Sequence, residues 1–192
     1  MDKIRTFIAI PLSDTIRRTI GKVQRELAET LSDIRWVRPE TIHLTLAFLG
    51  DISQESLDKI GNSMLSIGRS FTPFEVRIGD LGAFPSRSRP RVIWIGVERC
   101  PPLMELQAAL VETLADLGLP GEDRPYTPHL TLGRSRRLDP TAGRILETRA
   151  DLPIGSLAVD RMVLFESRLQ AGGAVHLPRQ TIVLDKRSEP SG

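Results

Sequence analysis

The tetrapeptide His43-Leu-Thr-Leu46 recurs unchanged as His129-Leu-Thr-Leu132. The two copies lie 86 residues apart, from position 43 to position 129. Each copy alternates polar and apolar residues, as a β-strand does, and residues i and i+2 of a strand share one face. The histidine and the threonine of each copy are therefore expected on one face of a strand, with both leucines on the opposite face, in a core.

The segments around the two copies repeat one another as well. In each half, apolar periodicity predicts the order strand, helix, strand, helix, strand, at an offset of about 85 residues. We expect strands at residues 3–11, 34–37, 43–49, 74–84, 91–97, 128–134, 157–165 and 174–184, and helices at residues 13–27, 53–69, 101–117 and 139–149.

This repetition predicts an α+β fold of two α/β lobes related by a pseudo-twofold axis. Each lobe is expected to be a sheet rich in antiparallel strands, with two helices on its outer face, and the two sheets face each other across a central cleft. We expect a single domain over residues 1–192, with one lobe at about 1–90 and the other at about 91–185. Exchange of strands between the lobes is left open, and residues 186–192 are expected to be a frayed tail.

The composition is typical of a globular protein, with 40% hydrophobic and 26% charged residues, and a net charge of +2 does not indicate a long groove for duplex nucleic acid. Of the 26 basic residues, 22 are arginines, which suit phosphate oxygens, although a GC-rich genome would explain the same bias. The single cysteine, Cys100, excludes an internal disulfide framework and a cysteine-rich zinc module. With neither an apolar run that could span a bilayer nor a signal peptide, we expect a cytoplasmic protein.

The two motifs together supply a set of groups for acid–base chemistry at a phosphate. Because imidazole titrates near neutrality, one histidine can take a proton from water while the other gives one to a departing oxygen. The hydroxyls of Thr45 and Thr131 can donate to non-bridging phosphate oxygens. Arg134, three residues beyond Thr131, can supply a cation for the charge of the transition state. One His-x-Thr would indicate a structural histidine, but two copies at matching positions favour a site.

The chain resembles the 2H phosphoesterase superfamily and, within it, the bacterial and archaeal RNA 2′,3′-cyclic phosphodiesterases, which are also called 2′-5′ RNA ligases. The twin motifs carry the resemblance to the superfamily. The resemblance to this branch rests on Trp36 and on residues 5–10, 43–50, 82–85, 90–96, 126–134 and 164–169.

The resemblance implies hydrolysis of an RNA 2′,3′-cyclic phosphate to a 2′-phosphate end, without a metal or another cofactor. His43 would be the proton donor to the leaving 3′ oxygen, and His129 the proton acceptor that activates water. Thr45, Thr131 and Arg134 would hold the phosphate. The implied partners are RNA ends, such as tRNA fragments or oligonucleotides, and nucleotides, with a monomeric protein. Joining of RNA ends through a 2′-5′ bond, the reverse reaction, is compatible with the same groups.

Several further residues are candidates for contact with the substrate. Phe84, like Trp36 and Trp94, could stack on a base, although Trp94 is expected in the core because it lies between two isoleucines. Tyr126 could brace the second motif or border the cleft. Arg91, in the basic loop 86–91, could meet an RNA backbone, as could Arg136 and Arg137, or the loop could be a solvated turn.

The third histidine marks a departure from the family. Many relatives carry a tyrosine after a glycine near the C-terminus, where this chain has Gly173-Ala-Val-His176. We expect a solvated or structural role for His176, in a region that helps to shape the cleft.

Two other functions fit the same residues. A binding module could hold an AMP-like nucleotide in this site without turnover, and tight binding of AMP with no hydrolysis of any cyclic phosphate would identify it. A phosphodiesterase of small cyclic phosphates would act on a mononucleotide rather than on an oligonucleotide.

Overall fold

The computed structural model describes residues 3–119, 121, 124–135, 140–149, 152–171 and 173–185. Over these residues the chain forms, in order, β1 (Ile4–Pro11), α1 (Asp14–Ala28), β2 (Ile34–Trp36), the short 3-10 helix η1 (Pro39–Thr41), β3 (His43–Ile52), α2 (Gln54–Gly68), β4 (Phe74–Ser86), β5 (Arg89–Val97), α3 (Pro101–Asp116), β6 (His129–Ser135), α4 (Pro140–Thr148), β7 (Pro153–Val159), β8 (Arg161–Gln170) and β9 (Gly173–Val183).

The helices begin where the sequence carries capping signals. The hydroxyl of Ser13 accepts a hydrogen bond from the backbone N–H of Ile16 at 3.4 Å, and α1 follows. Ser53 caps α2 in the same way. Two prolines open α3, where they leave no helical hydrogen bond unmade. The chain leaves α3 at Gly118, whose φ of +74° lies in the left-handed region that glycine adopts readily.

The strands form two antiparallel sheets, and each sheet takes strands from both halves of the chain. One sheet has the order β3-β1-β8-β9, and we call it the β3 sheet; the other has the order β2-β6-β5-β4-β7, and we call it the β6 sheet. Each motif strand therefore lies in a different sheet. The two sheets do not coincide with residues 1–90 and 91–185, because β8 and β9 complete the first sheet while β2 and β4 belong to the second.

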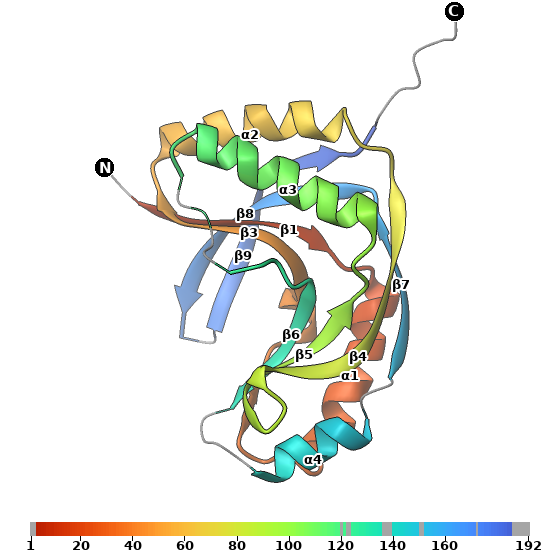
Figure 1. The fold of residues 1–192 in the computed structure, drawn as a ribbon. Helices are drawn as coiled ribbons and strands as arrows, with labels where there is room; N and C mark the ends of the chain where they lie inside the picture. The colour runs from red at the N-terminus through yellow and green to blue at the C-terminus, as the bar shows by residue number, and fades with distance from the viewer. Residues whose placement is uncertain are drawn as a thin grey trace, which may run out of the picture.

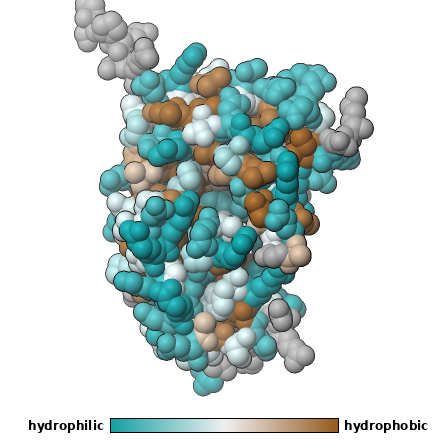
Figure 2. All heavy atoms as spheres, turned by 180° about the vertical axis from the view of Figure 1, so that it is seen from behind, coloured by the Kyte–Doolittle hydropathy of each residue, from teal (hydrophilic) through white to brown (hydrophobic). Residues whose placement is uncertain are grey.

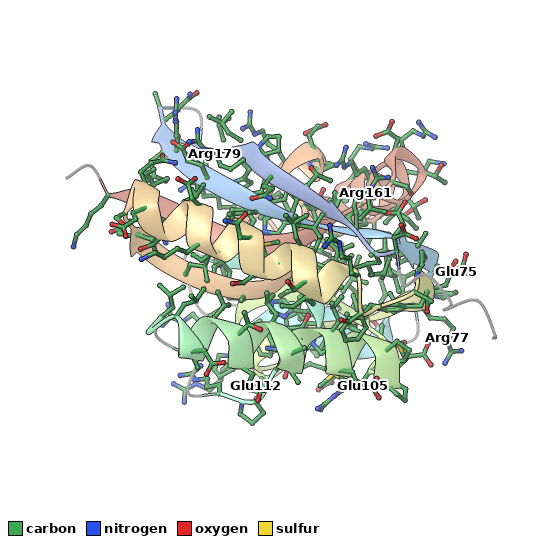
Figure 3. The ribbon with its side chains drawn as sticks, turned by 90° about the horizontal axis from the view of Figure 1, so that it is seen from above. Glu75, Arg77, Glu105, Glu112, Arg161 and Arg179 are labelled. Atoms are coloured by element: carbon green, nitrogen blue, oxygen red, sulfur yellow. The ribbon has the colours of Figure 1, made fainter. Side chains whose placement is uncertain are left out.

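Two helices cover each sheet, as expected. The helices α2 and α3 pack on each other and on the β3 sheet, whereas α1 contacts β7, and α4 contacts β4 and β5 of the β6 sheet (Figure 1). Seen from above, α2 and α3 run next to each other, and Glu105 and Glu112 point outward from α3 (Figure 3). The strands β3 and β6 contact each other where the two sheets meet. The four motif leucines, which are Leu44, Leu46, Leu130 and Leu132, are buried in the core.

One expected strand, at residues 157–165, is wrong. The chain passes at Asp160 from β7, in the β6 sheet, to β8, in the β3 sheet. Leu157 and Val159 are buried before this point in the sequence, and Met162 and Leu164 are buried after it. The positions that belong to the core cluster thus change from odd to even numbers, while Val163 is buried outside that cluster. No glycine or proline marks the crossing in the sequence, where only Asp160 and Arg161 interrupt the apolar residues.

The surface is largely hydrophilic. Figure 2 shows polar residues over most of the face seen from behind, with apolar residues in small groups between them. Phe48 is one of five exposed large apolar residues in the described part of the chain, with 57% of its surface exposed. No helix in the described part of the chain is long and apolar enough to cross a membrane.

Candidate active site

The two motif histidines make the same hydrogen bond. The Nδ1 atom of His43 lies 2.8 Å from the carbonyl oxygen of Thr41, and Nδ1 of His129 lies 2.7 Å from the carbonyl oxygen of Thr127. Since a carbonyl oxygen only accepts, each Nδ1 carries a hydrogen and donates it. This fixes the tautomer of both rings and leaves each Nε2 to exchange protons with a ligand.

The two tethering threonines were not recognised in the sequence, although the sequence carries a signal for them. Thr41 and Thr127 each stand two residues before a motif histidine, so the repeat is Thr-x-His-Leu-Thr-Leu in both copies. The bond uses the main-chain carbonyl of the threonine, which every residue has. Sequence comparison of the two halves could find the repeated threonine, but not the role of its backbone.

A β-bulge interrupts the first motif. In the pairing of β3 with β1, His43 lies opposite Pro11 and Thr45 opposite Ala9, whereas Leu46 is an extra residue before Ala47, which lies opposite Ile8. We call the face that carries His43 and Thr45 the inner face of the β3 sheet. Beyond the bulge, Phe48 pairs with Phe7 and shares this inner face, with the two ring centroids 6.3 Å apart.

The second motif contains the matching bulge. On β6, His129 lies opposite Gly96 and Thr131 opposite Trp94, but Gly133 lies opposite Ile93 and Arg134 opposite Val92, so that Leu132 is the extra residue. In a regular strand Arg134 would point away from Thr131, since they are three residues apart. The bulge reverses the alternation. His129, Thr131 and Arg134 therefore share the inner face of the β6 sheet.

Aromatic rings surround His43. Its imidazole stacks on Phe7 with centroids 4.5 Å apart and planes at 21°, and Phe165 lies beyond at 6.2 Å. Burial lowers the pKa of His43 to about 4, outweighing the hydrogen bond to the Thr41 carbonyl, which raises it. Charge on the nearby His176 lowers it further. His43 is thus neutral at pH 7.

His176 lies beside His43 rather than in solvent. The two rings meet edge to face, with centroids 5.2 Å apart and planes at 88°, and His176 also meets Phe7 at 4.8 Å. Burial, followed by the charge of Arg38, lowers the pKa of His176. Of the two roles expected for this residue, solvated or structural, the ring contacts favour the structural one. The hairpin of β8 and β9 pairs His176 with Ser167, and the ring of His176 reaches Phe7 of β1. A glycine-rich turn does not reveal which side chains a hairpin brings together.

His129 lies among different rings. Phe84 meets it edge to face at 5.0 Å, and Trp94 lies at 6.2 Å. The expectation that Trp94 is a core residue is wrong: Ile93 and Ile95 occupy the core face of β5, so Trp94 points to the inner face. Its ring lies over Gly82 of the neighbouring strand, where an added Cβ would come within 2.2 Å of it.

The other candidates have different surroundings. The Tyr126 hydroxyl donates to the Thr45 carbonyl at 3.0 Å, so Tyr126 ties the segment before the second motif to the first motif strand.

Trp36 packs against the core. Arg91 is exposed, beside an irregularity in the pairing of β4 with β5. At the tip of that hairpin, Arg87 donates to the Leu81 carbonyl at 2.8 Å. Arg136, Arg137 and the tail 186–192 lie outside the described residues.

Two hollows in the surface are lined by neither motif histidine. A hollow of about 980 Å³ is lined by residues that include Arg5, Arg168 and Glu166, and by Arg179 near the start of α2 (Figure 3). A smaller one of about 190 Å³ lies between α3 and β3. Within the ranges that the structure describes, no three side chains of His, Cys, Asp or Glu are grouped as a metal site would require.

Comparison with known proteins adds to this geometry. RNA 2′,3′-cyclic phosphodiesterase of Methanothermobacter thermautotrophicus is 33% identical over 91% of this chain and 95% of its own length. The crystal structure of TT0787 of Thermus thermophilus superposes with a TM-score of 0.78, at 26% identity, over 96% of this chain and all of that one.

LigT of Escherichia coli is similar too. In its apo form it superposes with a TM-score of 0.75, at 30% identity, over 97% of this chain and all of that one, and it has also been solved with 3′-AMP and with phosphate. The model of the LigT-like phosphoesterase family matches twice, at residues 10–94 and 95–176, which is once in each half of the repeat. This chain therefore belongs to the LigT-like phosphoesterase family.

Proposed function

We propose that this protein hydrolyses RNA 2′,3′-cyclic phosphate ends to 2′-phosphomonoesters, without a metal, by acid–base catalysis between His43 and His129. The observation that carries the proposal is the identical tether of the two imidazoles, each donating from Nδ1 to a carbonyl two residues earlier. The name of the relative from M. thermautotrophicus supports the substrate class. The complexes of E. coli LigT with 3′-AMP and with phosphate support a nucleotide phosphate as the ligand.

In the proposed reaction, Nε2 of His129 takes a proton from a water molecule as the water oxygen bonds to phosphorus. The bond from phosphorus to O3′ breaks, and Nε2–H of His43 gives its proton to that oxygen. The products are a 2′-phosphate and a free 3′-hydroxyl. Thr45 and Thr131 donate to the non-bridging oxygens, and the Arg134 guanidinium balances the charge that develops on them.

The protonation state of His43 gives this mechanism a requirement. A donor needs a proton, yet burial lowers the pKa of His43 to about 4. An anionic phosphate against the imidazole favours its charged form and raises its pKa. Binding of the substrate phosphate therefore leads to protonation of His43. Because Nδ1 already carries the hydrogen that it donates to the Thr41 carbonyl, the added proton goes to Nε2, from which it is transferred to the leaving oxygen.

The deciding experiment is incubation of an oligonucleotide ending in a 2′,3′-cyclic phosphate with the protein in excess EDTA. Phosphorus NMR then identifies the product. We expect turnover to a 2′-phosphate only. A 3′-phosphate product would contradict the assignment of the leaving oxygen, and loss of activity in EDTA would contradict a metal-free reaction. Tight binding of AMP without hydrolysis would identify the alternative, a nucleotide-binding module.

The same experiment tests the finer points. Adding an RNA fragment with a free 5′-hydroxyl tests the reverse 2′-5′ joining, and a cyclic mononucleotide in place of the oligonucleotide tests a preference for small substrates. The monomeric state and the cytoplasmic location also remain proposals from the sequence.

A further inference from the structure

Gln24 is one of three buried polar or charged residues in the described part of the chain, with 6% of its surface exposed. It lies on α1, on the side of the helix that faces the core. Its side-chain Nε2 donates to the Val37 carbonyl at 2.7 Å and to the Leu132 carbonyl at 2.9 Å. Both hydrogens of the amide nitrogen are therefore used, and both acceptors are main-chain atoms.

One of these acceptors belongs to the bulge of the second motif. Leu132 is the extra residue between Thr131 and Gly133. Its carbonyl accepts a second hydrogen bond from the backbone N–H of Val37, at 2.8 Å. The bulge is thus held by two donors, and it is this bulge that turns Arg134 to the face of His129 and Thr131.

We propose that Gln24 is a positioning residue for Arg134, which acts by holding the Leu132 bulge in place. This inference rests on the proposed function, in which Arg134 binds the phosphate. Gln24 itself touches no substrate. Without its amide, the bulge loses one of its two donors, and a strand that returns to regular alternation points the guanidinium away from the phosphate.

The first motif provides a matched control. Gln107 of α3 donates from Nε2 to the carbonyl of Leu46, the equivalent bulge residue, at 3.5 Å. The residue that this bulge turns inward is Phe48, which carries no charge. Both bulges therefore have a glutamine from a helix beside them, but only the bulge held by Gln24 presents a cation.

The test uses Gln24→Met, which keeps the length and volume of the side chain and removes both donors. Binding of inorganic phosphate is measured by calorimetry, alongside KM and kcat on the cyclic-phosphate oligonucleotide. We expect Arg134→Ala to weaken phosphate binding about 10- to 100-fold, as the loss of a charge-assisted pair does. Gln24→Met should weaken phosphate binding at least about fivefold, because a misplaced Arg134 loses part of its interaction with the phosphate. The same variant should raise KM more than it lowers kcat.

The double variant separates positioning from general destabilisation. In an Arg134→Ala background, Gln24→Met should have no further effect on phosphate binding, because the group it positions is gone. Gln107→Met should bind phosphate within about twofold of the unmodified protein. If Gln24→Met does not fold, Gln24→Asn replaces it, since its amide is one methylene too short to reach both carbonyls.

The outcomes are distinct. Phosphate binding unchanged in a folded Gln24 variant, or an equal further loss in the Arg134→Ala background, would overturn the positioning role and leave the proposed function intact. If Arg134→Ala alone binds phosphate normally, the phosphate site of the proposed function is itself wrong, and this inference falls with it.

Discussion

The two copies of His-Leu-Thr-Leu have the same backbone and different neighbours. Both histidines are tethered through Nδ1, and both motifs contain a bulge at the second leucine. In the β3 sheet, however, the histidine stacks on Phe7, and the bulge presents Phe48; in the β6 sheet the bulge presents Arg134. Duplicated strands supply two equivalent imidazoles, and the differences around them supply unequal environments. Acid–base catalysis needs that inequality, since one ring must give a proton while the other takes one.

The largest expected effect tests what the two copies share. His43→Ala and His129→Ala should each lower kcat by about 10²- to 10⁴-fold, because each removes one partner of the proposed proton transfer. Turnover of the cyclic-phosphate oligonucleotide is the measurement, and circular dichroism checks that both variants fold. Unchanged turnover in His129→Ala would show that the site does not use this pair.

The next effect separates the two bulges. Arg134→Ala should lower kcat/KM by about 10- to 100-fold, since a guanidinium paired with a phosphate is a strong interaction. Phe48→Ala, at the equivalent position, should change kcat/KM for a cyclic mononucleotide by less than about threefold, because it removes no charge from the phosphate. Equal losses in the two variants would mean that both sheets hold the phosphate.

The stability of the protein in acid should report on the burial of His43. A histidine whose pKa is lowered in the folded protein stabilises it above the unfolded pKa, near 6.5, and this stabilisation is lost as the pH falls through about 4. Up to about 3 kcal/mol of unfolding free energy is at stake for His43. Urea unfolding of the unmodified protein should therefore lose more stability between pH 6.5 and 4 than His43→Asn does. Parallel curves for the two proteins would show that His43 is not buried as described.

The proton affinity of His43 can be followed directly. NMR titration of its Cε1–H should report a pKa of about 4 in the free protein and a higher pKa with bound phosphate. No change on binding would mean that His43 does not touch the phosphate.

The smallest effect concerns His176, which has no counterpart beside His129 among the described rings. His176→Phe keeps the ring that buries His43 and removes its charge, so the pKa of His43 should rise slightly in the same titration. Burial, the larger cause, is untouched. A large rise would mean that charge rather than burial lowers the pKa of His43.

The sequence predicted the helices and most of the strands. Its predictions were wrong or left alternatives open where the structure depends on which strands pair and not on the periodicity of apolar residues. Capping serines and apolar spacing located the helices, because these signals act within a few residues. The single strand expected at 157–165 crosses between sheets at Asp160, and His176 reaches His43 through a hairpin. Both depend on which strands become neighbours, and short-range patterns do not carry that information.

The sequence alone determined the repeat, the two histidine–threonine pairs and the placement of their leucines in the core, since strand alternation follows from backbone geometry. Only the tertiary structure decided that Arg134 shares a face with Thr131. A regular strand would place the two on opposite sides, and the bulge that reverses this is held by Gln24, more than a hundred residues earlier in the chain. Contacts of that range form only when the sheets and helices pack. For this reason the candidate residues could be predicted from the sequence, but their arrangement could not.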